Sequence, residues 1–63
     1  MEEYLKLKQL VDEIADDIYK AQGGNKAAGT RVRKAMQEIK NTAQEVRRKV
    51  LELRVEEGPA AQA

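Results

Sequence analysis

Apolar residues recur at alternating intervals of three and four along two stretches of the chain. The first series ends before a polar break and consists of Tyr4, Leu7, Val11, Ile14, Ile18 and Ala21. The second series is longer and consists of Gly29, Val32, Met36, Ile39, Ala43, Val46, Val50 and Leu53. This spacing gives an α-helix one apolar side, close to the seam of a coiled coil. No stretch alternates with period two over a useful length, so no strand is expected.

The break between the two series contains residues that end one helix and begin another. Glycine suits the left-handed residue after a helix, and Asn25 is a good N-cap. Gly58-Pro59 ends the second helix. We therefore predict helices over about 2–22 and 26–56, a turn at 23–25 and a flexible tail at 58–63. So short a connection folds the helices back antiparallel, and residues 1–57 form an all-α, two-helix hairpin.

A hairpin of this size has a thin core. A chain of about 60 residues buries only about 60% of its unfolded surface, and the absence of cysteine and histidine excludes disulfides and the usual zinc sites. A second copy is the simplest remedy and gives a homodimeric four-helix bundle, although a tetramer stays open. Gly29 is expected to let the helices approach closely. The predicted core and dimer seam comprises Leu7, Val11, Ile14, Ile18, Val32, Met36, Ile39, Val46, Val50 and Leu53.

Charge is distributed unevenly, although the net charge is only +1. Residues 1–22 hold six acids and three lysines, whereas residues 26–49 hold eight bases and two acids. The second helix is therefore strongly basic, and a basic helix face attracts phosphate. The candidate phosphate contacts are Lys26, Arg31, Arg33, Lys34, Lys40, Arg47 and Arg48.

Some of these charges have acidic neighbours and could instead stabilise the fold. Residues three or four apart on a helix interact, which predicts the pairs Lys34–Glu38, Glu45–Lys49 and Arg48–Glu52. Antiparallel register also brings Asp17 near Arg31, and Glu2 or Glu3 near Arg47 and Arg48. Arg33, Lys40 and Arg47 have no acid at those spacings. The surplus favours a basic surface that binds a polyanion.

Other chemistry is poorly represented. Gly24, Gly29 and Thr30 resemble a phosphate-binding loop, but the required lysine and preceding strand are missing. The acids near Asp12 and Asp16 are too few for a metal site, and no cofactor, catalytic residue or small-molecule substrate is expected. No apolar run approaches the ~20 residues that span a bilayer. The acidic N-terminus lacks the pattern of a signal peptide, so we expect a cytoplasmic protein.

The run from Gly24 to Lys34, Gly-Asn-Lys-Ala-Ala-Gly-Thr-Arg-Val-Arg-Lys, resembles the bacterial linker-histone-like proteins. The match is sharp over these residues and looser over 4–54. The resemblance implies DNA binding in the nucleoid, self-association through the helical region, and roles for Lys26, Arg31, Arg33 and Lys34. The best-known members also carry a long basic tail, whereas here only residues 58–63 follow. The resemblance therefore supports nucleic-acid association better than compaction of the chromosome.

Two functions follow from these observations. The first is a homodimeric, histone-like protein that binds the backbone phosphates of double-stranded DNA without reading sequence. RNA is left open, because nothing in the sequence distinguishes the 2′-hydroxyl. The alternative is a helical oligomerisation or protein-interaction module that binds no nucleic acid.

Overall fold

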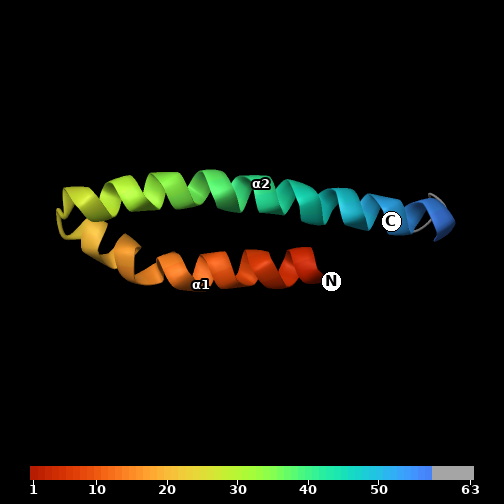
Figure 1. Cartoon of the computed structure of the whole chain (residues 1–63), viewed down its shortest axis with the longest axis horizontal. Coiled ribbons are helices and arrows are strands. Elements are labelled where there is room, and N and C mark those ends of the chain that lie inside the picture. The colour runs from red at the N-terminus through yellow and green to blue at the C-terminus, as the bar shows by residue number, and fades with distance from the viewer. Residues whose placement is uncertain (58–63) are drawn as a thin grey trace.

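The computed structural model describes residues 1–57, with side chains through Leu53. Helix α1 spans Glu2–Gln22 and helix α2 spans Lys26–Glu57. The two helices run antiparallel and pack side by side (Figure 1), so the predicted two-helix hairpin is confirmed. The tail predicted at 58–63 lies outside the described residues.

The turn between the helices is fixed by backbone hydrogen bonds. The Asn25 amide donates to the Lys20 carbonyl and the Gly24 amide to the Ala21 carbonyl, at 3.1 and 3.0 Å. This pair of bonds is the Schellman arrangement, which requires a left-handed residue after the helix. Gly24 supplies it with φ of +100°. The Asn25 side chain then accepts a bond from the Ala28 amide at 2.9 Å, which confirms the predicted N-cap.

A narrow row of residues on each helix faces the other helix, again at steps of three and four. Of the side chains that the structure describes, only Ile14, Ala28 and Thr42 are buried, at 6%, 0% and 5% exposure. The other members of the seam are half-buried, and two of them, Ala21 and Ala35, are small. Small residues allow the helices to lie close together but contribute little apolar area. The isolated hairpin therefore has a minimal core.

The predicted core and dimer seam divides into two parts. One part faces the opposite helix and is buried or half-buried: Leu7, Ile14, Val32, Ile39 and Val46. The other part is exposed to solvent: Val11, Ile18, Met36, Val50 and Leu53. The expectation for Gly29 is wrong, because a Cβ added there would meet nothing within 4 Å. Close approach near the turn depends instead on Ala28, one residue earlier.

The hairpin has two unlike flanks. In an antiparallel pair, the columns that border the buried row in the same rotational sense on each helix project to the same side of the plane that contains both helix axes. This side is apolar, and we call it the apolar flank: Tyr4, Val11, Ile18, Met36, Ala43 and Val50. The opposite side is the charged flank: Lys6, Glu13, Lys20, Arg31, Glu38, Glu45 and Glu52. The two interhelical ion pairs among the described side chains, Arg31–Asp17 and Lys49–Glu3, involve residues on or next to the charged flank.

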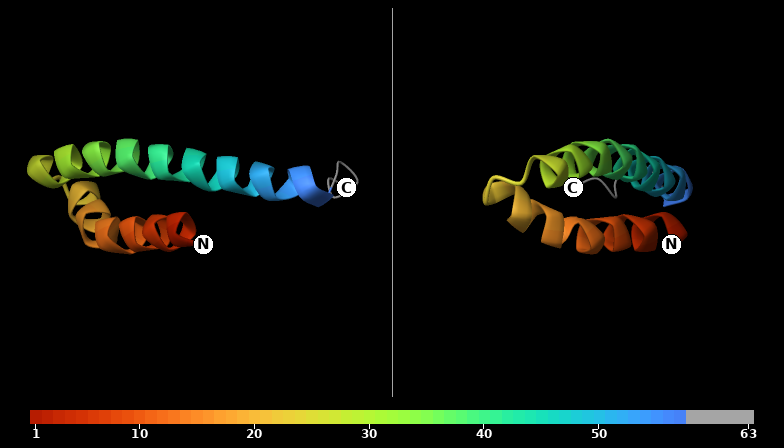
Figure 2. Two further views of the ribbon diagram at one scale, coloured as in Figure 1. Left: turned by 45° about the vertical axis from the view of Figure 1, so that its right-hand side comes forward. Right: turned by 60° about the vertical axis from the view of Figure 1, so that its left-hand side comes forward.

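Helix α2 extends well beyond the N-terminus of α1, as Figure 1 and the left view of Figure 2 show. The overhang leaves Leu53, which continues the column of Val32, Ile39 and Val46, 58% exposed. The end of α1 therefore covers only part of the apolar surface of α2.

Candidate nucleic-acid interface

The surface of α2 that faces away from α1 contains no acidic residue from Lys26 to Arg48. It comprises the three columns of the helix opposite the buried row, and all of its members are exposed. We call this surface the outer face: Lys26, Ala27, Thr30, Arg33, Lys34, Gln37, Lys40, Asn41, Gln44, Arg47 and Arg48. The acids of α2 within this range, Glu38 and Glu45, lie on the charged flank instead. The outer face is therefore a strip of positive potential.

The spacing of the bases follows from the helix repeat. Lys26, Arg33, Lys40 and Arg47 are seven residues apart, which places them in one column at intervals of about 10.5 Å. Lys34 and Arg48 lie in a second column on the other edge of the outer face. From Lys26 to Arg48 the strip is about 33 Å long, close to one turn of a B-form duplex at about 34–36 Å. Several backbone phosphates lie within reach of such a strip at once.

Two of the seven candidate bases are held by carboxylates. The Arg31 guanidinium donates to both oxygens of Asp17, at 3.0 and 2.8 Å. This hydrogen-bonded contact lowers the pKa of Asp17 and raises that of Arg31. Arg48 donates to Glu45 one turn earlier. Lys26, Arg33, Lys34, Lys40 and Arg47 form no ion pair within the described residues.

The pairing scheme differs from the expected one in detail. The predicted contact of Asp17 with Arg31 is confirmed. The pairs Lys34–Glu38, Glu45–Lys49 and Arg48–Glu52 are not formed. Glu45 contacts Arg48 instead, and Lys49 reaches across to Glu3 at 3.9 Å. The N-terminal acids are therefore met by Lys49 rather than by Arg47 or Arg48. Lys49 lies beside the seam, whereas the two arginines lie on the outer face.

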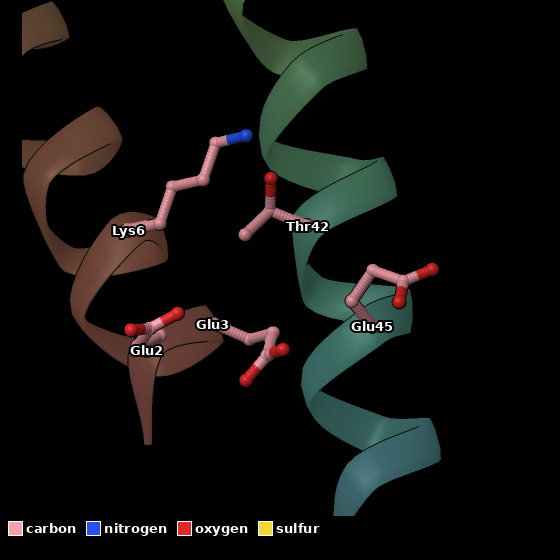
Figure 3. Close-up of a pocket in the computed structure, with 5 residues that line it drawn as sticks. All are labelled: Glu2, Glu3, Lys6, Thr42 and Glu45. Atoms are coloured by element: carbon pink, nitrogen blue, oxygen red, sulfur yellow. The ribbon is translucent and has the colours of Figure 1, made fainter.

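A hollow on the charged flank has the opposite character. It has a volume of about 280 Å³ and is lined by Glu2, Glu3, Lys6, Thr42 and Glu45. Figure 3 shows Glu3 and Lys6 extending from α1 toward α2, with the Thr42 side chain between the helices. Three carboxylates and one amine give this surface a negative balance. This negative balance disfavours nucleic acid at the hollow.

The sequence interpretation overlooked the neutral polar side chains of the outer face. Thr30, Gln37 and Gln44 form the central column, between the two basic edges, and Asn41 lies beside them. Amide and hydroxyl groups donate hydrogen bonds to phosphate oxygens. Thr30 donates to the Lys26 carbonyl at 3.3 Å. The seven-residue repeat of this column was a usable signal, although uncharged residues attract less notice than bases.

Comparison with known proteins agrees with this geometry. The sequence matches the family model described as "Histone H1-like protein Hc1" over residues 1–56. The chain belongs to this histone H1-like family. The resemblance stated from the Gly24–Lys34 run is thus confirmed. No curated protein and no solved structure matches the chain.

Two further properties of this histone H1-like chain bear on its surroundings. No helix within residues 1–57 is long and apolar enough to cross a membrane. Among the described residues, no three His, Cys, Asp or Glu side chains are grouped so that they could hold a metal ion.

Proposed function

We propose that this protein is a nucleoid-associated, non-enzymatic, DNA-binding protein that contacts backbone phosphates without reading sequence. The observation that carries the proposal is the acid-free outer face of α2, on which five bases have no carboxylate partner within the described residues. Membership of the histone H1-like family supports the same function. A nucleoid location in the cytoplasm is part of the proposal.

The proposed contacts are of two kinds. Lys26, Arg33, Lys34, Lys40 and Arg47 supply the main charge, whereas Arg31 and Arg48 contribute less because Asp17 and Glu45 already neutralise them. Phosphate contacts of this kind position a protein on DNA but carry no sequence information. Affinity should therefore be similar for duplexes of unrelated sequence.

The proposed working form is a homodimer. Its support is the minimal core of the hairpin together with the exposed apolar flank, where Tyr4, Val11 and Met36 are 53%, 49% and 40% exposed. Single copies of such small folds are marginally stable. Sizing of the purified protein should give the mass of two chains.

A salt titration tests phosphate binding. Five contacts predict a log–log slope of affinity against salt of about −4.5, or a loss of roughly 500-fold between 50 and 200 mM. The measurement is fluorescence anisotropy with two duplexes of unrelated sequence and a single-stranded RNA of equal length. A flat titration would contradict the proposal and favour a protein-interaction module.

Two matched variants locate the contact. Lys40→Gln on the outer face should weaken binding and reduce the salt slope by about one. Lys8→Gln removes the same charge from an exposed lysine of α1 and should leave the slope almost unchanged. Equal effects of the two variants would show that net charge, rather than the outer face, governs binding.

A further inference from the structure

The apolar flank and the outer face share one edge, so the way in which two copies pack determines where their outer faces point. On α2, the basic column Lys26, Arg33, Lys40, Arg47 lies directly beside the column Gly29, Met36, Ala43, Val50. An interface between identical copies with two-fold symmetry uses the same flank on both. The symmetry axis can run parallel to the helices or perpendicular to them, and the two arrangements have different consequences for DNA.

With a perpendicular axis, α2 packs against α2 of the other copy. The two basic columns beside the apolar flank then oppose each other across the interface. Like charges at such flanking positions are unfavourable and set partner choice in helical bundles. No acid of α2 is available to relieve the repulsion, because Glu38, Glu45 and Glu52 lie on the opposite flank.

With a parallel axis, α2 of each copy packs against α1 of the other. The basic column then faces α1, whose residues 1–22 hold six acids and three lysines, although Glu3, Glu13 and Asp17 lie on or next to the opposite, charged flank. On α1, the column beside the apolar flank contains one base, Lys8, followed by Ala15 and Gln22, and Asp12 lies in the next column. Repulsion across the interface is therefore weaker in this arrangement than in the perpendicular one, where two columns of four bases oppose each other.

Side-chain size also fits the parallel axis. The ion pairs Asp17–Arg31 and Glu3–Lys49 set the antiparallel register of the hairpin. A rotation about the parallel axis leaves positions along the helices unchanged. The apolar-flank residues of α1 in the second copy then fall between successive apolar-flank residues of α2 in the first. Ile18 of the second copy lies between Gly29 and Met36, and Tyr4 lies between Ala43 and Val50. Large side chains of α1 thus meet the small residues Gly29 and Ala43. Within the hairpin, a Cβ added at Gly29 would meet nothing within 4 Å and Ala43 is exposed.

From these observations we infer that a second copy docks on the apolar flank with α2 against α1, so that the dimer bridges two DNA duplexes. Rotation by 180° about an axis parallel to the helices turns one outer face directly away from the other. Each face then meets its own duplex. This inference rests on the proposed phosphate binding by the outer face, and it adds that the dimer holds two duplexes together.

Cysteine cross-linking tests the packing without DNA, and the natural chain contains no cysteine to interfere. Chains carrying only Val11→Cys are mixed with tagged chains carrying only Met36→Cys, and disulfide formation is followed by gel mobility. We expect the mixed product to predominate, and Met36→Cys alone to give little dimer. The control pair Glu13→Cys and Glu38→Cys lies on the charged flank and should give none. A predominant α2–α2 product, or equal yield on the charged flank, would overturn the arrangement.

A capture assay tests bridging. Duplex DNA on beads is incubated with the wild-type protein and a fluorescent second duplex, at protein concentrations that saturate a single-duplex gel shift. The wild type should retain about tenfold more fluorescent duplex than Val11→Asp, whose apolar flank carries a charge. If Val11→Asp fails to fold, Lys8→Glu serves instead: it adds a carboxylate opposite the basic column of the second copy and should increase capture.

The outcomes separate the two proposals. Loss of the single-duplex shift itself would contradict phosphate binding, whatever the cross-links show. A normal shift without capture of the second duplex would overturn bridging and leave phosphate binding intact. Mixed cross-links together with capture support the inference in full.

Discussion

Arg31 and Arg33 are two residues apart on α2 but differ in electrostatic surroundings. Arg31 is held by both oxygens of Asp17, whereas Arg33 projects from the outer face without a carboxylate partner in the described residues. A base that already has a carboxylate partner gains less from phosphate. The local environment therefore makes Arg33 more available to phosphate than Arg31. Their positions in the sequence do not reveal this difference.

We expect Arg33→Ala to weaken duplex binding several-fold more than Arg31→Ala, because only Arg33 is available to phosphate without breaking an ion pair. Anisotropy titrations at fixed salt measure both affinities. Arg31→Ala should instead lower the stability of the hairpin, which thermal unfolding followed by circular dichroism detects. The reverse ranking in binding would contradict the assignment of Arg31 to the fold.

The same ion pair predicts acid sensitivity. Because Arg31 lowers the pKa of folded Asp17, the unfolded state takes up a proton first as the pH falls. The contribution of the pair is present in full above the unfolded-state value of about 3.9 and is lost as the pH drops through the lower folded-state pKa. Thermal unfolding between pH 5 and pH 2 measures it. Asp17→Asn should flatten this part of the stability profile. The control Asp16→Asn removes a neighbouring carboxylate that does not contact Arg31, and the loss of stability at low pH should remain.

At the scale of the helices, packing depends on small residues in the seam. Ala28 is fully buried beside the turn, while its neighbour Ala27 is exposed on the outer face. Enlarging a tightly packed side chain costs about 1–3 kcal/mol, whereas an exposed substitution usually changes stability by less than about 0.5 kcal/mol. Close contact of α1 and α2 near the turn thus depends on one methyl-sized side chain.

Ala28→Leu should therefore lower the free energy of unfolding by about 1–3 kcal/mol, and Ala27→Leu should change it little. Urea unfolding monitored by circular dichroism compares the two variants. Similar losses for both would mean that the helix ends, rather than the seam, limit stability near the turn.

At the scale of the whole molecule, the proposed dimer links folding to association. The described part of the hairpin buries two apolar side chains, Ile14 and Ala28, and leaves the apolar flank exposed. If the folded form is a dimer, its stability depends on protein concentration. The charge imbalance between α1 and α2 belongs to the same scale, because it also affects how two hairpins would pack.

The unfolding midpoint should rise by about 3–6 °C for each tenfold increase in protein concentration. Differential scanning fluorimetry or circular dichroism over two decades of concentration measures this shift. A midpoint independent of concentration would contradict folding coupled to dimerisation, and sizing at the same concentrations provides the control.

The sequence by itself determined the elements, because their causes are local. Steps of three and four define the helices, Gly24 and Asn25 define the turn, and the charge imbalance identifies α2 as the basic element. The resemblance in the Gly24–Lys34 run also gave the family. Each of these signals lies within one helix or one turn.

Only the tertiary structure decided which apolar column faces the other helix. The columns Tyr4, Val11, Ile18 and Leu7, Ile14, Ala21 are adjacent and similarly apolar, so periodicity does not fix the rotation of the helix. Packing does, because Ala28, Ala35 and Thr42 let α2 approach α1 closely on one side. That rotation leaves the apolar flank uncovered and turns the outer face away from α1. The position of every candidate phosphate contact follows from it.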